Sequence, residues 1–437
     1  MQIDLSPYAN MRICVAVSGG KDSMALLHYL LKSGGGFGIT VSALNCDHGI
    51  RGEDSERDSA FVKAYCGDNG ISLRFLKAEK GSFKDENGAR KWRLDCYRRV
   101  LAEGFADVIA TAHHLNDNAE TVLFNLARGT SLAGLKGITD EPSLGIIRPL
   151  ISVSRGEIDE YIGSNNIPFV TDESNFSDRY TRNRIRHNVL PALEDAVGGA
   201  ARNIYNFSRL AAEDEEYFAR KAEEIIFRRG DAFLIKPCPE RVIFKRAVHA
   251  IVARGFDKID YTSEQFERLF LLQSAGNGKR FEFLGLAAVR EEEGVAIMRA
   301  DGLNLQSEEI PFSAALKAQS YAGKPLVIAC GENAEGVPPQ YKTLKFDLDR
   351  IPEGAAVRLR REGDRFTKFG GVSKSLSDYF TDKKVPQSIR SSLPLVCDGN
   401  EVLIICGVEI SDRVRLSENT VRPAYIAYGD PFKTYKA

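Results

Sequence analysis

The sequence predicts an α/β fold with a doubly wound parallel sheet, followed by a helical middle domain and a small β-rich C-terminal domain. Short apolar runs alternate with amphipathic helical segments through residue 150. Charged helical patterns dominate from about residue 189 to residue 272, and short strands with turn signals follow from about residue 314. Alternating strands and helices are typical of a parallel sheet with helices on both faces.

The first domain is expected to hold four strand–helix pairs. Apolar runs predict strands at residues 12–17, 39–46, 71–78 and 107–112, and apolar residues at helical spacing predict helices at 24–32, 54–66, 88–103 and 116–127. The glycine-rich residues 34–38 are expected to end the first helix. In the C-terminal domain, Asp398-Gly399-Asn400 between two apolar runs is a hairpin signal.

Length and composition set the broad class. The 437 residues predict about three domains, which we place at residues 1–205, 206–315 and 325–437. Hydrophobic residues make up 43% and charged residues 27%, which excludes a wholly disordered chain. The net charge of -1 gives no overall attraction for nucleic acid, so a basic surface has to be sought locally.

The eight cysteines form no CxxC pair, which argues against the common zinc and redox motifs and favours reduced thiols in a cytosolic protein. The N-terminal segment lacks the apolar stretch of a secretory signal, and no run of about 18 apolar residues predicts a membrane span. We therefore expect a soluble cytoplasmic protein with no membrane partner.

A phosphate-binding loop is predicted between the first strand and the first helix. The loop reads Ser18-Gly19-Gly20-Lys21-Asp22-Ser23. Two glycines allow backbone amides to approach an anion, the helix N-terminus adds partial positive charge, and Lys21 adds a full one. Asp22 fits an anion site only if a divalent cation bridges it to the phosphates. The alternative is an ordinary capped turn, and the loop is not a Walker A motif.

Polar side chains follow two further strands. Asp47 and His48 end the second strand, and His113 and His114 end the fourth. Ligands of open α/β sheets lie beyond the carboxyl ends of the strands, so these side chains are expected near the loop.

The next helix carries two carboxylates in line with the first histidine. His113, Asp117 and Glu120 follow at i, i+4 and i+7, which places them along one helix face. Paired carboxylates suit a cationic amine that must lose a proton before it attacks. Histidines with a purely structural role and a zinc site are the alternatives, and zinc is the weaker because no metal-ligand spacing is present.

The loop SGGKDS resembles the pyrophosphate-binding loop (PP-loop) of the N-type ATP pyrophosphatases. Further stretches are similar to the tRNA(Ile)-lysidine synthetase family and run in its order through about residue 190: NCDHGIRGEDS, GARKWRLDCYR, TAHHLNDNAETVLFNLARGTSLAGLKG, IIRPLI and TDESNFSDRYTRNRIRHNVLP. Asn116 and Asn118 depart from the family, which more often has Asp and Gln there.

The resemblance implies a two-step reaction. ATP, with Mg²⁺, adenylates the C2 oxygen of the wobble cytidine in the CAU anticodon of tRNA(Ile) and releases pyrophosphate. The ε-amine of L-lysine then displaces AMP and leaves lysidine. It implies catalytic roles for Lys21, Asp22, Asp117 and Glu120, and ATP binding by Ser18, Gly19, Gly20, Lys21, Asp22 and Ser23. The substrate-binding candidates are Asp47, His48, His113, His114, Asp117, Glu120 and Arg184. The metal ligands remain open.

Two basic segments are the tRNA-binding candidates. Residues 178–187 contain Arg182, Arg184 and Arg186, of which Arg182 and Arg186 are expected to contact tRNA, although an arginine-rich exposed helix start is the alternative. Residues 358–390 hold nine basic and four acidic residues, a net charge of +5. Arg358, Arg360 and Arg361 are its expected phosphate contacts, and its aromatics Phe366, Phe369, Tyr379 and Phe380 suit RNA unless they belong to the core.

Two other functions remain open from the sequence. A PP-loop tRNA thiolation enzyme is the nearest, but many such enzymes use paired cysteines that this chain lacks. A non-catalytic tRNA-binding homologue is the second, and the intact SGGKDS and HHxxDxxE motifs argue against it.

Overall fold

The computed structural model of the protein describes residues 1–49, 53–79, 82–83, 86–171, 181–256, 261–300, 309–318, 320–322, 324–331, 337–338 and 340–437. The chain forms two compact units, Met1–Glu216 and Tyr217–Ala437, and each is described by itself. The division into three domains stays a prediction, because the middle and C-terminal parts fall within one unit. In the described part of the chain, no helix is long and apolar enough to cross a membrane.

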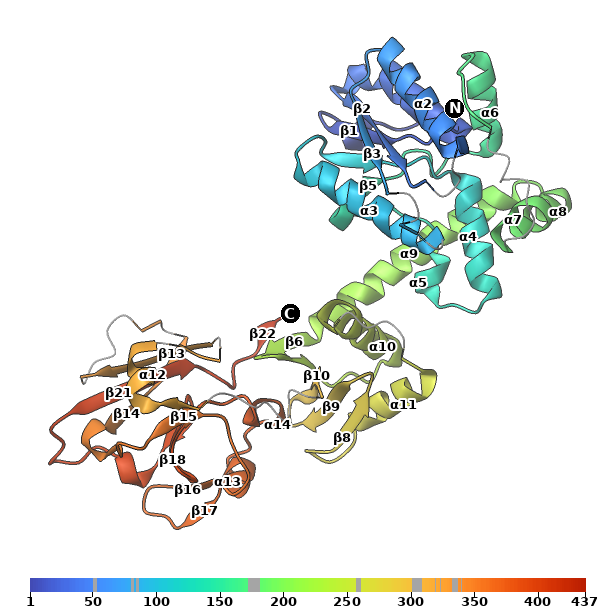
Figure 1. Cartoon of the computed structure of the whole chain (residues 1–437). Coiled ribbons are helices and arrows are strands. Elements are labelled where there is room, and N and C mark those ends of the chain that lie inside the picture. Colours follow the sequence, from blue (N-terminus) through green and yellow to red (C-terminus); the bar gives the residue numbers. More distant parts are fainter. Residues whose placement is uncertain are drawn as a thin grey trace. The chain divides into compact units, whose positions relative to one another are not determined.

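A five-stranded parallel sheet forms the centre of the first unit (Figure 1). Its strands are β1 (Arg12–Ala16), β2 (Thr40–Asp47), β3 (Leu73–Lys77), β4 (Val108–Ala110) and β5 (Ile146–Ile147), in the order β3-β2-β1-β4-β5. The four expected strands are confirmed and β5 adds a fifth. The strand order reverses at β1, and the crevice between β1 and β4 is where such sheets bind ligands.

Helices cover both faces of this sheet, which confirms the doubly wound fold. They are α1 (Lys21–Ser33), α2 (Glu53–Asp68), α3 (Glu86–Ala102), α4 (Leu115–Ala127) and α6 (Arg155–Ser164). Alternate residues of β1 point to opposite faces: Ile13 and Val15 pack with Leu26 of α1 and Ile158 of α6, whereas Cys14 packs in the core that contains Tyr97 of α3. The first helix begins at Lys21, three residues earlier than expected, so it includes half of the predicted phosphate loop.

The rest of the first unit is helical. Its elements are α5 (Leu132–Leu135), α7 (Thr181–Arg184), the π-helical turn η5 (Ile185–Val189), α8 (Leu190–Ala196), the part of α9 (Ala200–Glu224) up to Glu216, and the 3₁₀ turns η1 (Ser6–Tyr8), η2 (Gly34–Phe37) and η3 (Pro142–Leu144). Helix α9 packs against α4, where the buried Asn118 side chain donates to the Ser208 hydroxyl at 2.8 Å.

The middle part of the chain contains the expected helices, α10 (Arg241–Ala250) and α11 (Ser263–Leu272), with the π-helical turn η6 (Ile251–Gly255). It also contains a six-stranded sheet that the sequence did not predict, in the order β22-β6-β7-β10-β9-β8. Its strands are β6 (Ile226–Arg229), β7 (Ala232–Ile235), β8 (Arg280–Phe283), β9 (Leu286–Glu291), β10 (Gly294–Arg299) and β22 (Tyr435–Lys436). Phe244 and Phe266 of the helices pack with Ile235 and Ile297 of this sheet.

The C-terminal part is β-rich, as expected. One sheet holds β11 (Ile310–Pro311), β15 (Ala356–Arg358), β16 (Arg365–Thr367), β17 (Ser373–Ser375), β18 (Leu395–Asp398), β19 (Glu401–Ile405) and β20 (Glu409–Ile410). A second holds β12 (Ser320–Tyr321), β13 (Lys324–Cys330), β14 (Tyr341–Asp347) and β21 (Pro423–Gly429). The short helices are α12 (Phe312–Ala318), α13 (Leu376–Asp382), α14 (Gln387–Arg390), η8 (Leu348–Arg350) and η9 (Asp412–Val414). The predicted hairpin at Asp398–Asn400 is confirmed between β18 and β19.

Candidate active site

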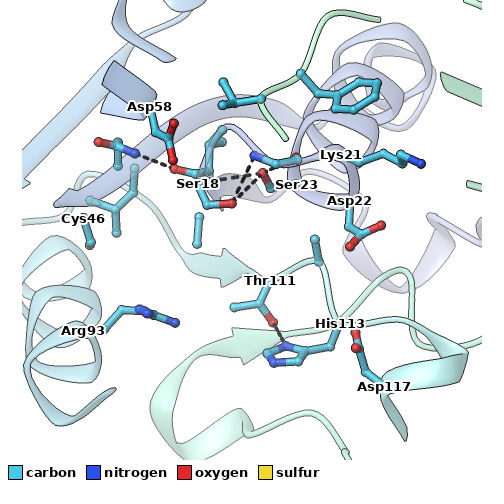
Figure 2. Close-up of a pocket in the computed structure, with 18 of the residues that line it drawn as sticks. Ser18, Lys21, Asp22, Ser23, Cys46, Asp58, Arg93, Thr111, His113 and Asp117 are labelled. Atoms are coloured by element: carbon cyan, nitrogen blue, oxygen red, sulfur yellow. Dashed lines mark hydrogen bonds between the residues drawn. The ribbon is translucent and has the colours of Figure 1, made fainter. Parts of the chain in front are cut away.

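The loop between β1 and α1 is held in one shape by its own serines (Figure 2). Gly19 adopts a positive φ of 89°, a conformation that residues with side chains rarely adopt. The Ser23 hydroxyl donates to the Gly20 carbonyl oxygen at 2.9 Å and accepts from the Ser18 amide at 3.2 Å. The helix begins immediately after Gly20, so its first amides lack carbonyl partners within the helix. The loop therefore has the shape and the free amides that suit the predicted anion.

A cavity of about 800 Å³ lies beside this loop, at the carboxyl ends of β1, β2 and β4. Leu44, Phe169 and Val170 give it an apolar part that suits a nucleobase. Its charged and hydroxyl-bearing lining includes Ser18, Lys21, Asp22, Ser23, His48, Asp58, Arg93, His113, Asp117, Arg155, Arg186 and His187. The cavity thus combines cations suited to phosphates with carboxylates suited to a metal ion or an amine.

The Lys21 ammonium forms an ion pair away from the middle of the cavity. Its Nζ lies 2.7 Å from Oδ1 of Asp159 on α6 and 5.4 Å from the centre of the Phe169 ring. Figure 2 shows the side chain pointing away from the other labelled residues. Both ends of the Lys21–Asp159 pair are partly exposed, so the pair is weak and a phosphate can compete with it for the lysine.

His114 lies between two carboxylates. Its Nε2 is 3.8 Å from Oδ2 of Asp22 and 3.5 Å from Oδ2 of Asp117. Its Nδ1 accepts from the Asn116 amide at 3.2 Å, and the Asp117 carboxylate accepts from the His114 amide, so the two residues cap helix α4 reciprocally. His114 therefore orients the helix and the two carboxylates.

The two carboxylates beside His114 differ in acidity. Burial raises the pKa of Asp22, an effect that the neighbouring His114 opposes. Burial also acts to raise the pKa of Asp117, but His114, His113 and Arg186 outweigh it and lower that pKa overall. Asp117 is therefore the more strongly anionic of the two.

Arg186 bridges the two carboxylates of α4. Its Nε donates to Glu120 at 2.7 Å, and its Nη2 donates to both Asp117 and Glu120 at 3.0 Å. Glu120 is only 1% exposed and does not itself line the cavity. Buried carboxylates require a cation, and here a side chain of the protein supplies it.

The structure places the arginines of residues 182–186 in different surroundings. Arg186, expected to contact tRNA, lines the cavity, whereas Arg184, expected at the substrate, is exposed and is not part of the lining. Arg182 is exposed as expected, and its guanidinium donates to the Thr121 hydroxyl. Residues 172–180, the beginning of the matching TDESNFSDRYTRNR stretch, lie outside the described residues.

The structure separates the two residues that end β2. The Asp47 carboxylate is buried and accepts from the Gly49 amide at 2.9 Å and the Ser55 hydroxyl at 2.5 Å. Asp47 is not in the cavity lining; its hydrogen bonds connect the end of β2 to Gly49 and to Ser55 of α2, and its substrate-binding assignment is not supported. His48 does line the cavity.

The two residues that follow β4 also differ. His113 lines the cavity, and its Nδ1 is 3.0 Å from the Thr111 hydroxyl. Burial lowers the pKa of His113 to about 4, so its imidazole is neutral at physiological pH. His114 has the capping role described above and is not in the lining.

Asn116 and Asn118, the departures from the family pattern, have structural contacts. The Asn116 side chain accepts from the Arg155 amide at 3.0 Å and connects the starts of α4 and α6. Asn118 is fully buried and also accepts from the Ile138 amide at 2.6 Å. Both amides are satisfied away from the cavity.

The charged or imidazole side chains of the cavity that the sequence interpretation missed are Asp58, Arg93, Arg155 and His187. Arg93 lies in the GARKWRLDCYR stretch that carried part of the resemblance, so a signal existed. Arg155 had none, because only the packing of α6 brings it to the cavity.

Arg358, expected to contact tRNA, is buried and 1% exposed. Its guanidinium donates to both oxygens of Asp364, at 2.7 and 3.0 Å, and to the carbonyls of Leu359 and Gly399. No face of the guanidinium is left for a phosphate, so this assignment is corrected to a structural one. Arg360 is partly exposed and Arg361 is exposed, and both remain available.

We expect Arg358→Ala to destabilise the second unit by about 3–5 kcal/mol, because it leaves the Asp364 carboxylate buried without its partner. Arg361→Ala is the matched control, since its pair with Glu309 is half exposed and is expected to contribute less than about 1 kcal/mol. Urea unfolding of both variants measures the difference. If Arg358→Ala instead unfolds with the free energy of the parent but binds tRNA more weakly, Arg358 contacts the RNA.

Comparison with known proteins agrees with this fold. Residues 2–193 match the PP-loop domain family, and residues 355–423 match the TilS substrate C-terminal domain. The tRNA(Ile)-lysidine synthase of Bacteroides thetaiotaomicron is 30% identical over 427 residues, which cover 94% of each chain. That of Caldanaerobacter subterraneus is 29% identical over 446 residues, with 95% of this chain and 93% of the relative covered.

A U34-tRNA thiolase from Methanococcus maripaludis superimposes with a TM-score of 0.40 at 21% identity, covering 47% of this chain and 73% of the thiolase. The cavity and loop define a PP-loop ATP-using enzyme. With a relative 30% identical along almost its whole length, the chain belongs to the tRNA(Ile)-lysidine synthase family.

Proposed function

We propose that this protein joins L-lysine to C2 of the wobble cytidine in the CAU anticodon of tRNA(Ile). The C2 oxygen attacks the α-phosphate of ATP and pyrophosphate leaves; the ε-amine of lysine then adds at C2, loses a proton, and AMP leaves. The observation that carries the proposal is that the phosphate loop shares one cavity with Asp117 and Arg186, and Arg186 joins them to the buried Glu120. A tRNA substrate also favours a cytoplasmic location.

The preformed loop supports the first step. The loop amides and the start of α1 favour negative charge at the phosphates, and Arg93 and Arg155 line the same cavity. For Lys21 to reach the phosphates, it must leave Asp159. Its charge then stabilises the negative charge that develops as the bond between the α and β phosphates breaks.

The carboxylates of α4 support the second step. Asp117 and Glu120 already hold a cationic guanidinium, so their site is electrostatically suited to an ammonium group. For the lysine ammonium to bind here, it must share these carboxylates with Arg186 or displace it. The amine attacks only after it loses a proton, and a nearby carboxylate is a suitable acceptor.

The residues present fit Mg²⁺ bound together with ATP. In the described part of the chain no three His, Cys, Asp or Glu side chains form a metal cage. Mg²⁺ usually takes one or two protein carboxylates and completes its shell with phosphates and water. Asp22, which lines the cavity at the start of α1, is the carboxylate that would hold it. When bound, Mg²⁺ would neutralise phosphate charge.

The described residues disfavour the thiolation alternative. All eight cysteines lie in the described part of the chain, and no three of them group with one another or with other ligands as a metal site. Cys46 lines the cavity, but a hydrogen bond with Cys96 and burial raise the pKa of its thiol, so it is protonated and a poor nucleophile at neutral pH.

A pyrophosphate-release assay tests the proposal. With ATP and tRNA(Ile) carrying the CAU anticodon, we expect pyrophosphate and adenylated tRNA; adding lysine should convert the intermediate to lysidine and release AMP. A transcript with a GAU anticodon is the control and should give neither product. Incorporation of sulfur in place of lysine would favour thiolation, and tRNA binding without pyrophosphate release would favour a non-catalytic homologue.

The exposed arginines of the C-terminal part are expected to contact tRNA phosphates. In Arg360→Ala/Arg361→Ala, the slope of log K against log salt should flatten by up to ~1.4, since each RNA phosphate contact contributes ~0.7. The KM values for ATP and lysine should hardly change. Filter binding over a salt series measures the slope, and Arg350→Ala, which removes another partly exposed arginine paired with Asp347, is the control. A slope equal to that of the parent would exclude Arg360 and Arg361 from the RNA interface.

A further inference from the structure

The turn between β16 and β17 projects an aromatic side chain from the C-terminal part. The Gly371 amide donates to the Lys368 carbonyl oxygen at 3.0 Å, and Gly370 has a positive φ of 62°. Glycine with positive φ in the third position is typical of a type II turn, which places Phe369 at the second position, on the corner. Phe369 is 45% exposed, and Val372 beside it is 86% exposed.

Cations surround this apolar corner. The Arg415 guanidinium lies 6.0 Å from the centre of the Phe369 ring and forms a partly exposed ion pair with Asp412 at 3.2 Å. The Arg365 guanidinium donates only to neutral groups of Ser373, its hydroxyl at 3.1 Å and its carbonyl oxygen at 2.8 Å, so its charge is not cancelled there. Lys368 is exposed, and in the described part of the chain no carboxylate lies within ion-pair distance of it.

The structure distinguishes Phe369 from the other aromatics of the basic segment. Phe366 and Phe380 are fully buried, Tyr379 is 1% exposed, and all three belong to the hydrophobic core of the C-terminal part. Among these four aromatics, Phe369 is therefore the one available to a ligand. The hydrogen-bonded turn fixes its position, so binding would cost little conformational entropy.

We propose that Phe369 stacks on a nucleobase of the bound tRNA, with Arg365, Lys368 and Arg415 beside the phosphates of that nucleotide. This proposal rests on the function proposed above. An exposed ring beside two cations without a carboxylate partner in the described residues, Arg365 and Lys368, and a third in a partly exposed pair matches the two parts of a nucleotide, a flat apolar base and an anionic phosphate. The base must be unpaired or at the end of a helix, because a base within a stem has both faces covered. A protein partner fits less well, since lysine is depleted in protein interfaces.

Phe369→Ala tests the proposal in the full-length protein. We expect its Kd for a tRNA(Ile) transcript to rise about 5- to 150-fold, the range for the loss of one stacked base. The salt slope should stay that of the parent, because no charge is removed. Arg415→Ala should instead flatten the slope by up to ~0.7. Phe369→Trp should bind at least as tightly as the parent, and its extra tryptophan fluorescence should be quenched by tRNA.

Tyr435→Ala and Tyr435→Trp are the matched controls. Tyr435 is also a half-exposed aromatic of the second unit, at 49%, and Lys433 lies 5.4 Å from the centre of its ring. The control substitutions should leave the Kd unchanged and show no quenching. The stacking proposal is overturned if Phe369→Ala binds tRNA with the Kd of the parent, or if Phe369→Ala and Tyr435→Ala lose the same amount of affinity. Either result counts even if the parent forms lysidine. A parent that binds tRNA but forms no lysidine refutes the proposed function and leaves the affinity test to decide the stacking.

Discussion

Lys21→Ala is expected to lower the rate of pyrophosphate release about 10²- to 10³-fold, with tRNA affinity nearly unchanged. Removing one group that stabilises developing charge in a closed site typically costs this much. The loop amides and the start of α1 would still bind the phosphates, so we expect the rate constant to fall more than the affinity for ATP. Single-turnover adenylation of the tRNA, measured with saturating ATP, provides the rate.

Asp159→Ala is the matched control for Lys21. It breaks the same 2.7 Å ion pair but keeps the lysine. If Lys21 acts on the phosphates, Asp159→Ala should adenylate tRNA at about the parent rate, because an exposed pair contributes little to stability. Equal loss in both variants would show that the pair itself matters. Parent activity in Lys21→Ala would refute the assignment of the loop.

Glu120→Gln and Asp117→Asn are expected to lower kcat/KM for lysine about 100-fold, while adenylation of the tRNA is much less affected. Truncating one member of a close charge pair costs about 2–5 kcal/mol, which corresponds to such a factor. The second carboxylate and Arg186 would remain in place. Adenylated tRNA should therefore accumulate when ATP is present and lysine is limiting, and chromatography of nuclease-digested tRNA detects it.

Retained adenylation also serves as the folding control for these variants. Glu213→Gln removes an exposed carboxylate from α9, where it pairs with Arg209, and should change neither step. If Glu120→Gln instead slows both steps equally with the parent KM for lysine, the α4 carboxylates belong to the ATP site. That result would also assign Arg186 to the phosphates.

The sequence by itself determined those parts of this protein whose structure depends on residues close to one another along the chain. The strand–loop–helix of residues 12–33 follows from an apolar run, a glycine that tolerates a φ of 89°, and serines that satisfy the loop. The face shared by His113, Asp117 and Glu120 follows from helical spacing alone. The family resemblance rested on these same short segments, and a relative aligned along almost the whole chain confirms it.

Only the tertiary structure decided which members of each charged or aromatic set face a ligand. Arg184 and Arg186 are two residues apart, and contact with α4 brings one of them to the carboxylates. Arg358 and Arg361 look alike in the sequence, but Asp364 and the Gly399 carbonyl hold Arg358 in the interior. Four aromatics share the same basic segment, and three of them are buried in the core.

The sheet of the middle part was missed only partly for this reason. Its pairs β6–β7, β8–β9 and β9–β10 are hairpins of consecutive strands, which were local signals that the sequence interpretation overlooked. The pairs β7–β10 and β6–β22 join segments far apart in the sequence, and no local window contains them. Burial and strand pairing depend on partners distant along the chain, and neither helical spacing nor charge counting records them. The short motifs and their chemistry could be predicted from the sequence, whereas the exposure of each side chain could be known only from the tertiary structure.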